Sequence, residues 1–197
     1  MLLRPVILDV ESGRGNAVPK LTAAQIAWVV QQVAAYIGQQ RDIYVHRAAP
    51  LASSQKGALQ PFLPGSALDS ARVVVLSGER VGNPPFYVEL VQMGFERGSL
   101  PDFAHMGAIT FVDTVVSHEP FTNELLFHEL VHVVQYQKLG LADFASKYVR
   151  GFLSGGSYEA IPLEMNAYEL DARFTAGPTK PFSVEAEVQE WIDAGKF

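Results

Sequence analysis

The spacing of apolar residues predicts a long helix near the start of the chain. Within residues 21–37, apolar side chains recur every three or four positions, which is the period of one face of an α-helix. Gly38 follows and is a typical helix end, so the helix is expected to stop there. Residues 42–46 are then expected to form a short strand. The helical repeat consists of Ile26, Val29, Val30, Val33 and Ile37.

The other segments of the first half differ in composition and predict short elements of different kinds. Residues 1–10 begin with an apolar stretch that is typical of a first strand. Residues 48–70 are rich in Pro, Ser, Gly, Gln and Ala, which break both the helical and the strand period, so a long loop is expected there. A short β-branched run at residues 71–76 predicts a buried strand. Residues 86–93 are expected to form a short helix.

The second half has stronger signals. Residues 108–117 are rich in β-branched residues and contain neither Gly nor Pro, which favours a strand. Helical periodicity follows to the end of the chain, interrupted at Gly140, which is expected to end the first of these helices. The order indicates an α+β fold with a small mixed sheet in the N-terminal half and helices in the C-terminal half, in one domain covering residues 1–197. The expected helices are residues 123–139, 142–153, 162–174 and 184–194.

Composition narrows the possible functions. Of the 197 residues, 48% are hydrophobic and 18% charged, and no apolar run approaches the roughly 20 residues that cross a bilayer. The net charge of −6 and the lack of a Lys/Arg cluster argue against a nucleic-acid partner. The beginning of the chain lacks the features of a signal peptide, which favours a cytoplasmic protein. The sequence has no cysteine, so a transition metal would need His and carboxylate ligands.

One motif carries the chemistry. His128, Glu129 and His132 form an HExxH pattern in a strongly apolar helix. Two histidines four residues apart project from the same face of a helix and can bind one metal ion. Glu129 lies about 100° further round the helix, where it can activate a water molecule as general base. The competing interpretation is an accidental match on a solvent-facing stripe, but two imidazoles in an apolar helix are costly to bury without a partner.

A third ligand is expected further along the chain, because catalytic zinc normally takes three protein ligands. The acidic candidates between residues 157 and 172 are Glu159, Glu164, Glu169 and Asp171. Glu164 and Asp171 share one helical face with Tyr168, so spacing alone favours that face without selecting one ligand. His46, His105 and His118 have no helical partner and are expected to be structural or surface residues.

With a strand, the HExxH helix and a later helix that carries a glutamate, the sequence resembles the gluzincins, and in particular their small single-domain members, the minigluzincins. The resemblance covers residues 108–173, and HExxH is its only specific part. It implies a zincin-like fold and a Zn²⁺ ion held by His128, His132 and Glu164. Where the group often has an aspartate that orients a histidine, this chain has Tyr168, and Asp171 one turn further on is expected to take that role.

The resemblance implies a zinc metallopeptidase that acts on a peptide or protein. In such enzymes the strand before the HExxH helix commonly borders the cleft, and a peptide can add to its edge. A second donor to the transition state is expected from Tyr158 or Tyr168. Two alternatives remain open at this stage: an inactive zinc-binding scaffold covered by residues 48–70, and a hydrolase of non-peptide amides. The sequence leaves the oligomeric state open.

Overall fold

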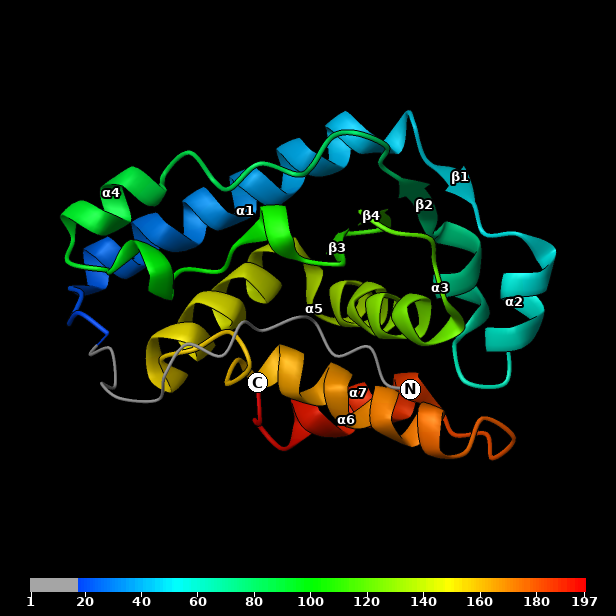
Figure 1. Cartoon of the computed structure of the whole chain (residues 1–197). Coiled ribbons are helices and arrows are strands. Elements are labelled where there is room, and N and C mark those ends of the chain that lie inside the picture. The colour runs from blue at the N-terminus through cyan, green and yellow to red at the C-terminus, as the bar shows by residue number, and fades with distance from the viewer. Residues whose placement is uncertain (1–17) are drawn as a thin grey trace.

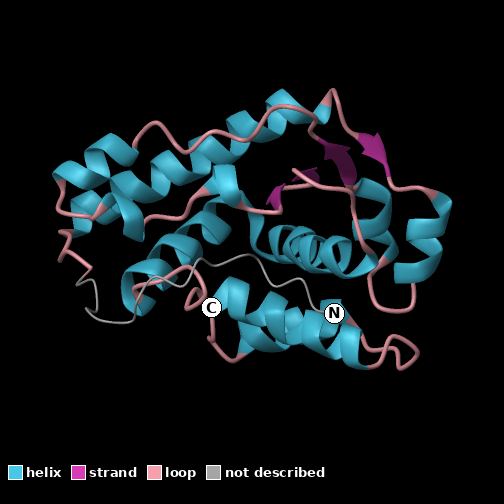
Figure 2. Cartoon of the chain, in the orientation of Figure 1, coloured by secondary structure: helices cyan, strands magenta, loops and turns pink. Residues whose placement is uncertain are grey.

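The computed structural model describes residues 18–197 of the chain. Within this range helices make up most of the fold, and the strands are few and short (Figure 2). The strand expected at residues 1–10 lies outside the described residues. The elements, in chain order, are α1 (Ala23–Val45), β1 (Ala49–Pro50), α2 (Ser53–Leu59), α3 (Gly65–Ser70), β2 (Arg72–Val75), α4 (Tyr87–Gln92), η1 (Arg97–Ser99), η2 (Phe103–His105), β3 (Ala108–Phe111), β4 (Thr114–Ser117), α5 (Asn123–Gly155), α6 (Pro162–Ala176) and α7 (Val184–Asp193).

Helix α5 occupies the middle of the molecule. Figure 1 shows α1 along one side of it and α6 with α7 along the other, and α5 contacts all three helices. One hydrophobic cluster joins α2, α3, α6 and α7 to the first part of α5, around Phe127. A second cluster joins α1 and residues 84–106, here called the α4 segment, to the second part of α5. The expected α+β class is confirmed, since a four-stranded sheet accompanies these helices.

Helix α1 extends further than the sequence predicted. It begins at a capping box in which Thr22 and Gln25 exchange hydrogen bonds, as expected for a helix start. It then runs through Gly38 to Val45, so both the predicted stop and the predicted strand at residues 42–46 are wrong. A glycine inside a helix costs only about 1 kcal/mol, and burial of Tyr44 beyond it favours continuing the helix.

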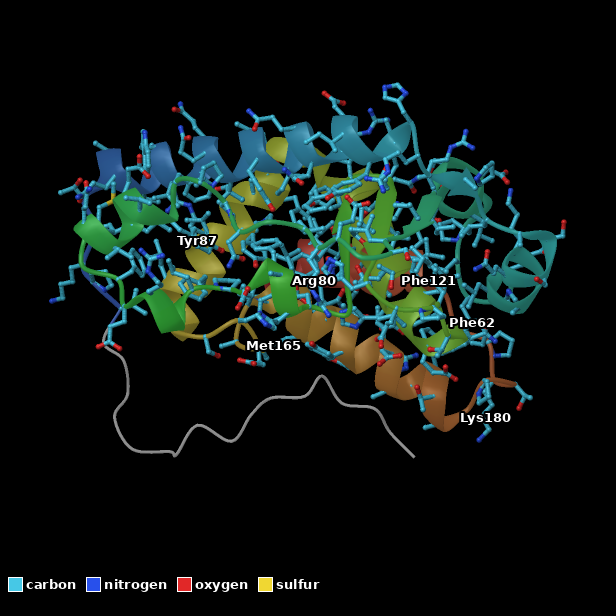
Figure 3. The ribbon with its side chains drawn as sticks, turned by 45° about the horizontal axis from the view of Figure 1, so that its top comes forward. Phe62, Arg80, Tyr87, Phe121, Met165 and Lys180 are labelled. Atoms are coloured by element: carbon cyan, nitrogen blue, oxygen red, sulfur yellow. The ribbon has the colours of Figure 1, made fainter. Side chains whose placement is uncertain are left out.

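The predicted loop at residues 48–70 is also wrong, because it contains β1, α2 and α3. The prolines and glycine that suggested a loop lie at element boundaries: Pro64 precedes α3, whose first residue is Gly65. Proline is common at helix starts, where an unpaired backbone N–H is no loss. Leu59 and Phe62, the latter labelled in Figure 3, are buried in the first cluster, and this burial stabilises two helices too short to form alone.

The sheet has the order β1-β2-β4-β3, with β2 parallel to β4 and the other pairs antiparallel. Strand β2 and helix α4 confirm the strand predicted at residues 71–76 and the helix predicted at 86–93. The predicted burial of the strand is wrong, because the residues of β2 are half-buried and Val75 is exposed. The single strand predicted at 108–117 is wrong, since β3 and β4 form a hairpin. The chain turns at Val112, whose φ of 62° is unusual for a β-branched residue. Arg41 of α1 binds the next residue, Asp113, through two hydrogen bonds of 2.8 Å, so a tertiary contact holds this turn.

The helices predicted in the second half are confirmed, including the interruption at Gly140. That residue has φ 73° and ψ 164° inside α5, which a side chain would disfavour, and the helix changes direction there (Figure 1). Gly151 allows the start of α6 to approach, because a Cβ atom there would lie 2.6 Å from Cδ of Pro162. This close approach positions the first turn of α6 beside α5. Among the described residues, no helix combines the length and hydropathy needed to cross a membrane.

Candidate metal centre

Two helices bring the predicted ligands together. His128 and His132 lie one turn apart on the first part of α5, and Glu164 lies in the first turn of α6. The Nε2 atoms of His128 and His132 are 3.7 Å and 3.4 Å from Oε2 of Glu164. Among residues 18–197, these three side chains are the group of metal-ligating type whose ligand atoms all lie within 4.8 Å of one another.

The spacing of these atoms matches a small coordinated cation. Zinc binds imidazole nitrogen and carboxylate oxygen at about 2.0–2.2 Å, usually with tetrahedral angles. Two ligand atoms of one tetrahedral ion therefore lie about 3.4 Å apart. The separations between Glu164 and both histidines are close to this value, so the donor set fits a zinc ion.

Burial makes this cluster of three ligands unfavourable when no metal ion is bound. Glu164 is 3% exposed and His132 5%, and Oε2 of Glu164 has no hydrogen-bond partner within the described part of the chain. A buried carboxylate oxygen without a partner costs free energy. A cation between the three ligand atoms removes that cost.

The charges around the cluster also favour a cation. Burial alone would lower the pKa of His132, but the carboxylates of Glu164 and Glu129 outweigh it and raise that pKa to about 9. Burial likewise would raise the pKa of Glu164, and the two imidazoles instead hold it well below its usual range. The site therefore stabilises positive charge next to an ionised carboxylate.

The orientation of His132 is fixed by Gln135, a residue that sequence reasoning missed. Nδ1 of His132 lies 2.9 Å from Oε1 of Gln135. The amide nitrogen of Gln135 donates to the backbone carbonyl of Leu163 at 2.9 Å and to Oδ1 of Asn166 at 3.0 Å. With both amide protons used on α6, the oxygen accepts from Nδ1–H, and Nε2 is left to face Glu164. The i, i+3 spacing from His132 was the available signal.

Glu129, the candidate general base, is held from the sheet. It is buried, and the hydroxyl of Thr110 on β3 donates to its Oε2 at 2.7 Å and contacts its backbone carbonyl at 3.1 Å. Glu129 lies next to His128 in sequence but outside the three-atom cluster. This is the position expected for a group that handles protons without binding the metal. No sequence pattern singled out Thr110.

Tyr158, Tyr168 and Asp171, which were predicted to assist the metal ligands, differ in their surroundings. The ring of Tyr168 lies 4.6 Å from that of His128. The charge of Glu164 contributes to raising the pKa of the Tyr158 phenol. Burial raises the pKa of both phenols, so both keep their protons at neutral pH. Burial raises the pKa of Asp171, and the charge of His128 opposes this rise. Its Oδ1 is buried without a hydrogen-bond partner in residues 18–197.

The other acidic candidates and histidines lie elsewhere. Glu159 and Glu169 are exposed, as are His46 and His105. His118 is structural: its Nε2 accepts from the backbone N–H of Val81 at 3.0 Å and its Nδ1 lies 2.6 Å from the carbonyl of Met106. It thus ties the start and the end of the connection between β2 and β3. The expectation that these histidines are structural or surface residues is confirmed.

Comparison with known proteins gives no relative. No protein-family model matches the chain, and neither a curated protein nor a solved structure is similar enough to match it. The functional argument therefore rests on the geometry of this chain.

Proposed function

We propose that this protein is a zinc-dependent metallopeptidase of the gluzincin type, with His128, His132 and Glu164 as the metal ligands. The observation that carries the proposal is the convergence of these three buried ligand atoms from two helices. An accidental HExxH match would have no reason to meet a buried glutamate of a different helix. Zinc is favoured among metals because two imidazoles and one carboxylate are one of its catalytic ligand sets and the two histidines belong to an HExxH pattern.

The side chains around the cluster fit hydrolysis. When bound, zinc lowers the pKa of a water molecule toward 7 and polarises a carbonyl group. Glu129 would take a proton from the attacking water and pass it to the leaving amine, and the Thr110 hydroxyl holds one of its carboxylate oxygens. The protonated phenols of Tyr158 and Tyr168 are the candidate donors to the developing oxyanion. Asp171 is the candidate to orient His128.

Part of α6 near the metal ligands is exposed to solvent. Tyr168 is 37% exposed and Met165, which follows Glu164 and is labelled in Figure 3, is 48% exposed. The alternative of a scaffold covered by residues 48–70 has little support, because those residues pack as α2 and α3 in the first cluster. None of them lines the cavity beside the metal ligands.

The proposal is tested by metal content and turnover in one set of variants. Plasma mass spectrometry of purified protein is expected to give about one zinc ion per wild-type chain. His132→Ala and Glu164→Ala are expected to lose it, whereas Glu129→Gln keeps it. Glu169→Ala is the matched control, since Glu169 is an exposed glutamate of the same helix.

Hydrolysis of a mixed pool of capped peptides is then measured for the same proteins. Wild type and Glu169→Ala are expected to cleave, and Glu129→Gln is expected to be inactive although it holds zinc. Full activity of Glu129→Gln would rule out its role as base. A wild-type protein that neither contains nor takes up zinc would overturn the proposal as a whole. Zinc binding without any cleavage would favour the scaffold, and cleavage of small acyl amides alone would favour a non-peptide amidase.

A further inference from the structure

A surface groove of about 610 Å³ follows the part of α5 after Gly140. Its lining residues on that helix recur every three or four positions between Asp143 and Gly155, so they share one helical face. The start of α6 at Pro162 and the side of Phe197 complete the lining. The volume falls within the range of about 300–1,000 Å³ that is typical of binding sites. None of these residues lines the cavity beside the metal ligands, so the groove is a separate feature.

The groove carries two cationic side chains, Lys147 and Arg150, one helical turn apart. Lys147 donates to the backbone carbonyl of Phe197 at 3.5 Å, and Arg150 donates to the hydroxyl of Ser146 at 3.3 Å. An ammonium group has three donors and a guanidinium group five, so both side chains keep donors for a further acceptor. Asp143 is the one acidic residue in the lining. The groove is therefore suited to a ligand with carboxylates.

The described part of the chain begins next to one end of this groove. Cγ2 of Val18 would lie 3.6 Å from a Cβ atom at Gly156, the residue after the last groove residue of α5. Seventeen residues precede Val18. From Gly155 to Asp143 the helix rises about 18 Å, a distance that about six extended residues cover. Residues 1–17 are thus long enough to follow the whole groove.

The sequence before Val18 matches the character of the groove. Residues 5–11 read Pro-Val-Ile-Leu-Asp-Val-Glu, an apolar run with two carboxylates at Asp9 and Glu11. Residues two apart in an extended chain point to the same side, so both carboxylates can face one pair of cations. Residues 12–17, with two Gly, one Ser and one Asn, have the composition of a turn or connection.

We propose that residues 1–11 of this chain occupy the groove, with Asp9 and Glu11 beside Lys147 and Arg150. The segment then packs against Pro162, the first residue of the helix that carries Glu164. It covers the junction of α5 and α6 from outside and holds the two helices together. One consequence rests on the proposed function: the seated segment strengthens zinc binding, because it stabilises the position of the third ligand.

The natural chain has no cysteine, so an introduced pair reports directly on the position of the segment. The groove pair is Val10→Cys with Ser154→Cys, since Val10 lies between the two carboxylates and Ser154 is exposed in the groove. The control pair is Val10→Cys with Gln92→Cys. Gln92 is exposed on α4 and is also near the start of the described chain, because Cβ of Pro19 would lie 3.4 Å from a Cβ atom at Gly94.

Disulfide formation under mild oxidation is followed by intact-mass spectrometry after the remaining thiols are alkylated. The groove pair is expected to form an intramolecular disulfide about tenfold faster than the control pair, because docking raises the effective concentration of the two thiols. Equal rates would overturn the docking. Disulfide-linked dimers of the groove pair would also overturn it, since a second copy would then supply the segment.

Charge reversal tests the two ion pairs. Lys147→Glu with Arg150→Glu is expected to slow disulfide formation in the groove pair about threefold or more, because two exposed ion pairs become like-charge contacts. Adding Asp9→Lys with Glu11→Lys is expected to restore the rate. A rate that is unchanged by the first reversal, or not restored by the second, would overturn this pairing. The control for the change in net charge is reversal of two exposed cations outside the groove, Arg97→Glu with Lys180→Glu, the latter residue labelled in Figure 3.

A last measurement separates failure of the docked segment from failure of the metal centre. Zinc affinity of the groove pair is measured by competition with a chelator, once in the disulfide form and once after reduction and alkylation. The disulfide form is expected to bind zinc about fivefold more tightly. Equal affinities would overturn the effect on the metal. Fast disulfide formation in a protein that takes up no zinc would overturn the metal centre and keep the docked segment, whereas zinc binding with equal disulfide rates in the two pairs would overturn the docking alone.

Discussion

Nδ1 of His132 lies 2.9 Å from Oε1 of Gln135, and the same amide group donates two hydrogen bonds to α6. One fully buried side chain therefore fixes the ring of a candidate ligand and also joins the two helices that supply the ligands. The position of Glu164 relative to His132 depends on this contact as well as on apolar packing.

Replacing Gln135 by Leu is expected to weaken zinc binding about 10- to 100-fold, because partners that orient a ligating histidine have effects of that size. It is also expected to lower the free energy of unfolding by about 1–3 kcal/mol, since Asn166 loses a buried partner. Zinc affinity is measured by competition with a chelator. Gln137→Leu is the control, because Gln137 is exposed on the same helix. An unchanged affinity in folded Gln135→Leu would contradict the positioning role.

Replacing Thr110 by Val removes the hydroxyl that holds Oε2 of Glu129. We expect kcat to fall roughly 10- to 100-fold, because a misplaced catalytic group can cost that much, while the zinc content stays the same. Thr114→Val serves as the control, since this buried threonine of the same hairpin binds Asp113 and not Glu129. Equal activity losses in the two variants would indicate a general disturbance of the hairpin.

The hairpin turn is expected to give a pH-dependent contribution to stability. Burial raises the pKa of Asp113, but the hydrogen bonds from Arg41 and Thr114 outweigh it, so the pKa in the folded protein lies below its usual value. Because this pKa is lowered on folding, the stabilisation by ionised Asp113 is fully present above its pKa in the unfolded chain, about 3.9. It is lost as the pH falls through the pKa of Asp113 in the folded protein.

This dependence is measured by urea unfolding of wild type and Asp113→Asn between pH 7 and pH 2.5. The difference in unfolding free energy between the two proteins is expected to be constant above about pH 5 and to shrink at lower pH. A difference that stays constant over the whole range would show that the charge of Asp113 does not stabilise the turn.

The core behind the ligands is expected to depend strongly on Phe127. Its ring is stacked on that of Phe174, with centroids 4.3 Å apart, and it is fully buried next to His128. Phe127→Ala is expected to lower the free energy of unfolding by about 3–5 kcal/mol, because the variant leaves a cavity between α5 and α6. Phe121→Ala is the comparison, since Phe121, labelled in Figure 3, is only partly buried against the same cluster. Similar losses in both variants would contradict the central role of Phe127.

Local patterns in the sequence determined the helices of the second half and the motif within them. The 3.6-residue period and the terminal signals correctly placed α5, with its break at Gly140, and α6 and α7. The spacing of His128 and His132 on one face follows from helix geometry alone. These features depend on neighbours a few residues apart, so the sequence carries them directly.

Contacts between distant segments decided the rest. The short helices α2 and α3 gain their stability from burial against α5, and the β3–β4 turn is held by Arg41 from α1, so no local signal revealed either one. Residue spacing left Glu164 as one of several acidic candidates, and the close approach of α6 at Gly151 is what sets it opposite His132. Gln135 and Thr110 take their roles only when helices and sheet pack together, because burial and hydrogen bonding between elements are properties of the tertiary structure.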